Sequence, residues 1–139
     1  MQDALPLGVE AVHATIPQAL KELIAFGMVD VEGCVCLKSL LGRAHVSRAD
    51  FPDATGYECF VNHIHLDEYV STNMIAVGIA LLNEISGTLR RGFADRSFQG
   101  IIAADESSCA LRFHTVRLGE QWLADDLDAY EECICVIDL

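Results

Sequence analysis

Two histidines and an aspartate alternate in the string HIHLD, residues 63–67. Alternate residues of a β-strand point to the same side, so a strand here would present His63, His65 and Asp67 together. Imidazole and carboxylate groups bind transition metals and also act as general acids and bases. The spacing indicates a metal-binding or ligand-binding site, and the plainer interpretation is that these histidines only satisfy local hydrogen bonds.

The strand predicted further along the chain carries His114 on the same face as Arg112. This pair would extend a polar patch around the first two histidines. His114 alone specifies no chemistry. One interpretation of the chain is therefore a small enzyme or a ligand-binding protein with its site on one sheet face.

The six cysteines offer a different chemistry, because four of them form two C-x-C pairs in the apolar runs GCVCL and ECICVI. If those runs were neighbouring strands, Cys34, Cys36, Cys133 and Cys135 would meet, and four thiolates bind zinc. In a reducing compartment the alternative is a set of buried free thiols, because cysteine packs as a small hydrophobe. We expect buried thiols and no bound metal.

Negative charge is concentrated in residues 118–139, which carry seven acids and no base within a chain of net charge -12. An acidic surface speeds association with a basic protein, and aromatic side chains are common interface anchors. The plainer interpretation is a solvated acidic turn, with Trp122 as a core plug beside Leu123 and Leu127. The predicted partner-binding residues are Glu120, Trp122, Asp125, Asp126, Asp128, Tyr130, Glu131 and Glu132.

Several classes of function are excluded by composition. Nucleic acid is not expected as a ligand, because phosphate binding needs clustered lysine and arginine. No glycine-rich phosphate loop occurs, so no nucleotide cofactor is predicted. The first residues lack a secretory signal, and the longest apolar stretch, 74–82, falls short of the ~20 residues that span a bilayer. We therefore expect a cytoplasmic protein that does not contact membranes.

Hydrophobic periodicity and turn residues predict a single α+β domain over residues 1–139. The order α-β-β-α-β-β-β, without regular βαβ alternation, indicates a mainly antiparallel sheet of about five strands, with a long buried helix and an N-terminal helix packed on it. A capping box of Thr15 and Gln18 begins the first helix, and residues 47–56 form a loop. The predicted helices are 16–26 and 69–91, and the predicted strands are 34–40, 57–66, 98–104, 109–117 and 133–138.

The chain is acidic and is predicted to form an α+β domain. Together with the string RFHTVRLGEQWLADDLDAYEE, residues 112–132, these features resemble bacterial immunity proteins of contact-dependent or polymorphic toxin systems. The resemblance implies a protein that binds and neutralises a cognate toxin domain by covering its active site. We expect no catalytic residue and no cofactor. Such toxin domains are often basic nucleases, which matches the acidic segment. A homodimeric interaction protein is a third interpretation, since 52% hydrophobic residues leave room for one uncovered sheet face.

Overall fold

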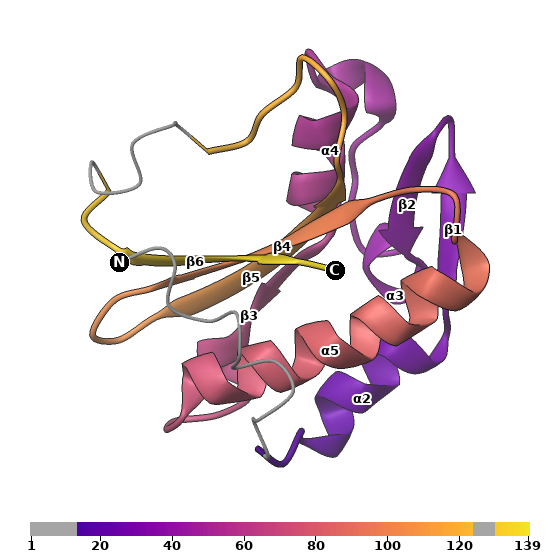
Figure 1. Cartoon of the computed structure of the whole chain (residues 1–139). Helices are drawn as coiled ribbons and strands as arrows, with labels where there is room; N and C mark the ends of the chain where they lie inside the picture. The colour runs from indigo at the N-terminus through magenta and orange to yellow at the C-terminus, as the bar shows by residue number, and fades with distance from the viewer. Residues whose placement is uncertain (1–13, 124–129) are drawn as a thin grey trace.

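A four-stranded antiparallel sheet lies at the centre of the structure (Figure 1). The computed structural model describes residues 14–123 and 130–139. Its strands follow the order β3-β5-β4-β6, and each neighbouring pair is antiparallel. The predicted α+β class and mainly antiparallel sheet are thus confirmed. The strands are β3 (His63–His65), β4 (Phe98–Ala104), β5 (Cys109–Thr115) and β6 (Cys133–Asp138).

The β4–β5 hairpin closes through the polar turn that the sequence predicts. The carboxylate of Asp105 accepts hydrogen bonds from the backbone N–H groups of Ser107 and Ser108, at 3.0 and 2.8 Å. Such an Asx turn replaces backbone hydrogen bonds with a side chain. The predicted bounds of β4 and β6 are confirmed, and β5 ends at Thr115, two residues before its predicted end.

Helix α5 (Met74–Gly92) crosses one face of this sheet. Its close approach depends on two glycines: a Cβ at Gly78 would come within 2.9 Å of Ile102, and one at Gly100 within 2.7 Å of Leu82. The helix begins five residues later than predicted. A 3-10 turn, η2 (Leu66–Glu68), and the left-handed backbone of Asn73 (φ 55°) precede it and break helical geometry.

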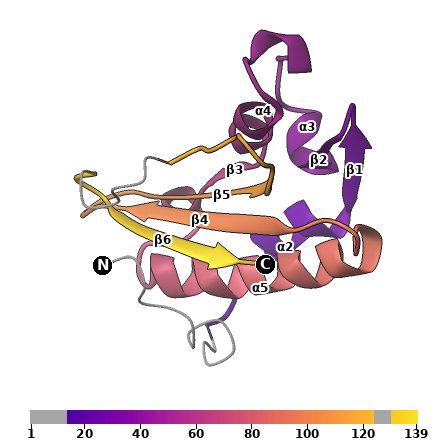
Figure 2. The ribbon, with the colours of Figure 1, turned by 45° about the horizontal axis from the view of Figure 1, so that its top comes forward.

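The N-terminal helix α2 (Gln18–Ala25) is shorter than predicted and packs against α5 and α3 (Lys38–Leu41) (Figure 2). It lacks the predicted capping box, because its N-cap is Pro17 and no side chain caps it. It ends at Ala25, one residue before the predicted end, and the predicted stop at Gly27 is confirmed. Gly27 follows the helix with a φ of 81°, a conformation that glycine adopts without a steric penalty.

A second sheet of two strands, β1 (Met28–Val31) and β2 (Cys34–Leu37), corrects the prediction of one five-stranded sheet. Glu32 and Gly33 connect them with positive φ angles of 53° and 84°, as in the tight turns that match hairpin twist. The sequence analysis missed β1 and extended β2 to Leu40, where the chain instead turns into α3. The apolar run continues through both elements, so hydrophobicity alone does not locate the boundary.

Helix α4 (Ala54–Val61) replaces most of the predicted strand 57–66, of which only β3 is extended. The side chain of Asp53 accepts a hydrogen bond from Gly56 N–H at 2.7 Å and begins the helix. The predicted loop before it contains the 3-10 turn η1 (Arg48–Asp50). A strand over residues 57–66 would carry apolar residues on both faces, which is typical of a strand buried on both sides. The N-cap residue Asp53 was the signal for a helix.

The connection between β5 and β6, residues 116–132, is called the crossover below. Both strands pair antiparallel to β4, so they run in the same direction and the chain must return along the sheet between them. Figure 2 shows residues 116–123 running back on the side of the sheet away from α5. The sheet therefore has an inner face against α5 and an outer face beneath the crossover.

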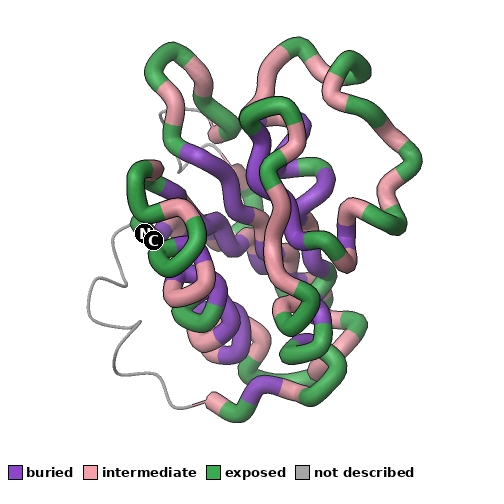
Figure 3. Tube along the Cα trace, turned by 90° about the vertical axis from the view of Figure 1, so that its right-hand side faces the viewer, coloured by how far each residue is buried: buried purple, intermediate pink, exposed green. Residues whose placement is uncertain are grey.

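Buried residues follow the strands and the inward sides of the helices, and exposed residues occupy the turns (Figure 3). The central core joins the inner sheet face to α5, with Leu82, Ile102, Leu111 and Phe113 fully buried. In the described part of the chain, no helix combines the length and apolarity required to cross a membrane.

We predict that Gly100→Ala lowers the free energy of unfolding by about 1–3 kcal/mol, because its methyl group would overlap Leu82 in a packed core. Gly92→Ala is the matched control, since a Cβ there meets no atom within 4 Å and should change stability by less than about 0.5 kcal/mol. Urea unfolding of both variants measures this. Equal stability of the two would show that α5 does not approach β4 as closely as described.

Candidate functional site

The outer face of the sheet gathers side chains that lie far apart in the sequence. The strand register places His63 beside Arg112, Arg112 beside Ile101, and Ile101 beside Val136. Ile101 is only 2% exposed although it lies outside the main core cluster. The outer face is thus a second packed surface.

Arg112 organises this face. Its Nε donates to the carbonyl oxygen of Cys59 at 3.2 Å, and its guanidinium carbon lies 5.1 Å from the ring centroid of Trp122, within cation–π distance. Its Nη2 is 3.4 Å from Nδ1 of His63. Arginine only donates, so His63 Nδ1 accepts and the imidazole proton sits on Nε2.

His63 and His65 share one strand face, as predicted, with ring centroids 4.2 Å apart. Burial, followed by the charge of Arg112 and the neighbouring His65, lowers the pKa of His63 to about 4. A neutral imidazole therefore stands beside a permanent cation. Nε2 of His63 is buried, and no described residue accepts its proton.

Asp67 does not lie with the two histidines, so the prediction that all three side chains share one strand face is wrong for Asp67. The strand ends at His65, and Asp67 lies in η2, where its carboxylate accepts from Cys109 N–H at 3.0 Å. His114 shares the outer face with Arg112, is buried, and donates from Nδ1 to the carbonyl oxygen of Thr115 at 2.7 Å. Within residues 14–123 and 130–139, no three His, Cys, Asp or Glu side chains form a group able to hold a metal ion.

The two C-x-C pairs are also kept apart. Cys34 and Cys36 lie in β2, which pairs with β1, whereas Cys133 and Cys135 lie in β6, which pairs with β4. The four-thiolate arrangement considered above is therefore wrong. All six thiols are free, and five are buried, as expected. Burial raises the pKa to about 12 for Cys36 and Cys59, and to about 11 for Cys109 and Cys135.

The predicted partner-binding residues all belong to the crossover, which ends directly before β6. Asp125, Asp126 and Asp128 fall outside the described residues. Glu131 and Glu132 are exposed, and Tyr130 is half-buried. Trp122 is 39% exposed, so it is not the core plug considered above.

The β4–β6 register places a second pair of acids beside this segment. Ala104 pairs with Cys133, so the exposed turn residues Asp105 and Glu106 lie at the same end of the sheet as Glu131 and Glu132. We call these four residues the acidic end. The contribution of the β4–β5 turn is not predicted from the sequence, because only strand pairing brings the two segments to one end of the sheet.

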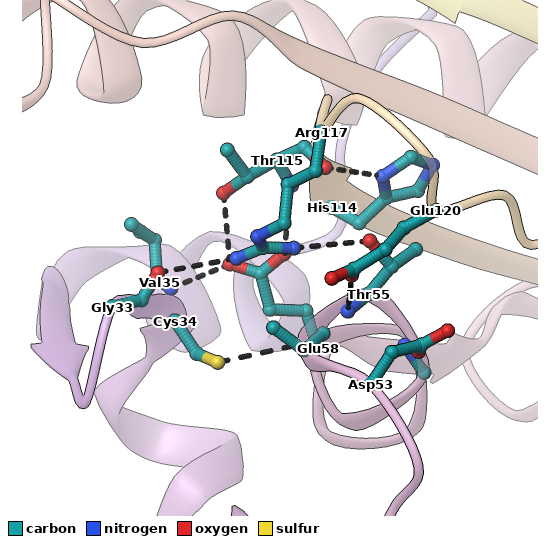
Figure 4. A network of polar contacts seen from close by, with 12 residues as sticks. Gly33, Cys34, Val35, Asp53, Thr55, Glu58, His114, Thr115, Arg117 and Glu120 are labelled. Carbon is teal, nitrogen blue, oxygen red and sulfur yellow. Dashed lines mark hydrogen bonds and ion pairs between the residues drawn. The ribbon is translucent and has the colours of Figure 1, made fainter.

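Glu120 has a structural role that the sequence did not indicate. Its carboxylate accepts a hydrogen bond from Thr55 N–H at 2.9 Å, in the first turn of α4 (Figure 4). The backbone and side-chain hydrogen bonds of Thr55 lower the pKa of Glu120. Glu120 therefore holds the crossover against α4. Its carboxylate is already hydrogen-bonded within the protein.

A network of buried polar groups lies beneath this contact (Figure 4). Glu58 is fully buried, and its two carboxylate oxygens accept from Val35 N–H at 2.7 Å, from Thr115 N–H at 2.8 Å and from the Thr115 hydroxyl at 2.8 Å. Arg117 forms an ion pair with it at 2.8 Å and donates to the carbonyl oxygen of Gly33 at 3.1 Å. One carboxylate thus joins β2 to the end of β5.

Asn62 stands one helical turn after Glu58 and is equally buried. Its carbonyl accepts from Leu37 N–H at 3.0 Å, and its amide donates to the carbonyl oxygens of Val35 and Phe113, at 2.9 and 3.3 Å. We call Glu58 and Asn62 the α4 bracket. The sequence analysis placed both in a strand, whereas the i, i+4 spacing of two polar residues in an apolar helix was the signal available.

The chain belongs to the family described as the Uncharacterized protein PM0498 family, whose model matches residues 2–139. A relative from Pasteurella multocida (strain Pm70), described as "Uncharacterized protein PM0498", is 30% identical over 119 residues. The match covers 78% of this chain and 74% of that protein. No solved structure matches the chain.

Removing the amide of the α4 bracket should destabilise the protein. Asn62→Ala leaves Val35 O, Leu37 N–H and Phe113 O without their buried partner, which should cost about 2–4 kcal/mol of unfolding free energy. Asn83→Ala, at an exposed position of α5, should cost less than about 0.5 kcal/mol. Chemical denaturation measures both. A loss below about 1 kcal/mol for Asn62→Ala would contradict this role.

The lowered pKa of His63 predicts an acid-dependent loss of stability. The unfolded chain binds a proton at His63 near the ordinary value of 6.5, and the folded protein only near 4, so stability present above pH 6.5 is lost as the pH falls toward 4. Melting temperatures at pH 7 and pH 5 should therefore differ more for the wild type than for His63→Gln. His45→Gln, at an exposed histidine, should behave as the wild type.

Proposed function

We propose that the chain is a cytoplasmic immunity protein that binds and neutralises a basic toxin domain through the acidic end and the acidic crossover. The observation that carries this proposal is the register of β4 with β6, which brings Asp105 and Glu106 to the same end of the sheet as Glu131 and Glu132. A negative surface built from two segments is larger than the sequence cluster alone. Such a surface attracts a positively charged partner and disfavours nucleic acid.

Some of this negative charge is offset, because Arg112 interacts electrostatically with Glu132, and Arg117 and Arg48 interact with Glu120. Arg117 is paired with Glu58, and Arg112 lies under Trp122. Arg90 and Arg91 belong to the last turn of α5, whereas the first turn of that helix lies near Asp105, since both line one cavity.

Trp122 supplies an anchor beside the acids. Its ring is partly exposed, and Arg112 holds it from below. An aromatic side chain that is already positioned loses little conformational entropy when a partner covers it. Aromatic residues of this kind contribute a large share of the binding energy in many interfaces.

Charge reversal at the acidic end should weaken binding of a basic partner. The wild-type chain is used to capture proteins from the native lysate at low salt, and the retained basic protein is purified. We expect Glu131→Lys with Glu132→Lys to weaken its affinity by about tenfold or more, and high salt to reduce the wild-type affinity. Calorimetric titration of the purified pair measures both effects.

The matched control is Glu22→Lys with Glu84→Lys, which makes the same change of charge at exposed positions of α2 and α5. It should bind nearly as the wild type does. Inhibition is tested by expressing the captured protein in a host cell, where co-expression of the wild type should restore growth and the Glu131/Glu132 variant should restore less. Equal weakening by both charge reversals, or a captured protein that is not toxic, would contradict the proposal.

A further inference from the structure

The four-stranded sheet ends at β6, and no described strand pairs with the outer edge of β6 (Figure 2). The hydrogen bond from Leu139 N–H to the carbonyl oxygen of Phe98, at 2.9 Å, shows which backbone groups face β4. Bonded residues alternate along an antiparallel pair, so Ile134, Val136 and Asp138 direct their N–H and C=O groups outward. This edge therefore presents three backbone donors and three acceptors to a partner strand.

The other described strands that end a sheet are short, charged or covered. β1 has four residues, and its Asp30 forms an ion pair with Arg96. The free edge of β2 is bonded by the α4 bracket, and β3 has only three residues, two of them histidines. β6 has six residues, contains no proline or lysine, and carries one charge, Asp138 at its end. Short strands and charges prevent strand addition, so β6 is the edge that remains open to it.

A second copy of the chain fits this edge along the whole strand. Two β6 strands related by a two-fold axis at Val136 pair antiparallel, with Cys133 of each opposite Leu139 of the other. Val136 then lies opposite its own copy, and Ile134 lies opposite Asp138. All three outward donors and all three outward acceptors of each strand meet a partner in this register.

Charge favours this register over its neighbour. With the axis at Val136, Asp138 faces the apolar Ile134, and no like charges lie opposite each other. With the axis at Cys135, Glu132 would lie opposite Asp138 on the same side of the sheet, and opposed like charges destabilise a strand pair. The strand is therefore complementary to itself in one register, which makes a second copy the matching occupant.

We infer that the chain forms a two-fold dimer in which β6 pairs antiparallel with β6 of a second copy and joins the two four-stranded sheets into one. On the inner face, Cys135 lies opposite Ile137 of the other copy, and both belong to the apolar core. The inference does not depend on the proposed immunity function, because Glu131 and Glu132 lie outside the paired residues and stay available to a toxin domain.

Sedimentation and amide hydrogen exchange of the full chain test the pairing together. We expect a dimer at about 100 µM protein, where an association with a micromolar Kd is nearly complete. In a monomer the outward amides of Ile134, Val136 and Asp138 exchange rapidly, because no strand covers them. In the dimer their exchange should slow by about tenfold or more, as for amides that are bonded within a sheet.

Val136→Lys is the disrupting variant, because it sets two ammonium groups opposite each other at the axis and leaves the bonds between β6 and β4 in place. It should weaken dimerisation by about tenfold or more. Val116→Lys makes the same change of charge at an exposed residue of the crossover and should dimerise as the wild type does. Val136→Thr keeps the β-branched shape without a charge and should also dimerise.

Three results would overturn the inference. One is a monomer at about 100 µM protein, whether or not the three outward amides are protected, because protection in a monomer would come from another part of the same chain. Another is a dimer in which these amides exchange rapidly, since its contact would lie elsewhere. The third is a folded Val136→Lys variant that dimerises as the wild type does. The exchange measurement uses the wild-type chain, so it decides the question even if Val136→Lys does not fold.

Discussion

The fold depends on two polar side chains, Glu58 in α4 and Asn62 directly after it, that satisfy the edges of two different sheets. β3 is too short to pair along all of β5, and β2 is left with an open edge beyond β1. Glu58 and Asn62 fill the space between, bonding Val35 and Leu37 on one side and β5 on the other. Buried backbone groups must be paired, so the bracket holds the hairpin against the main sheet.

The bracket also determines where the crossover begins. Arg117 follows β5 directly and is held by Glu58, and Glu120 then reaches the first turn of α4. These contacts direct the crossover over the outer face, where Trp122 lies on Arg112. The surface proposed to bind a toxin domain is thus positioned by a structural ion pair some residues away, and a change at Glu58 would alter binding without touching the interface.

Arg112 has contacts both on the outer face of the sheet and at β3. Arg112 supports Trp122 on one side and fixes the proton of His63 on the other. One guanidinium therefore links Trp122, in the segment proposed to bind a partner, to the histidine of β3.

Local sequence determined the elements that have their own signals: the β4–β5 hairpin with its Asx turn, the span of β6, the glycine after α2 and the long apolar helix. It also showed the acidic segment and the paired faces of His63 and His65. Tertiary structure alone decided the rest, because Glu58 and Asn62 read as strand residues until α4 brings them between two sheets. Strand pairing likewise separated the C-x-C pairs, turned Asp67 toward Cys109, and brought Asp105 and Glu106 to Glu131 and Glu132. Such contacts span long stretches of chain, so the spacing of Glu58 and Asn62 indicates that they share one side of a helix but not which strands they meet.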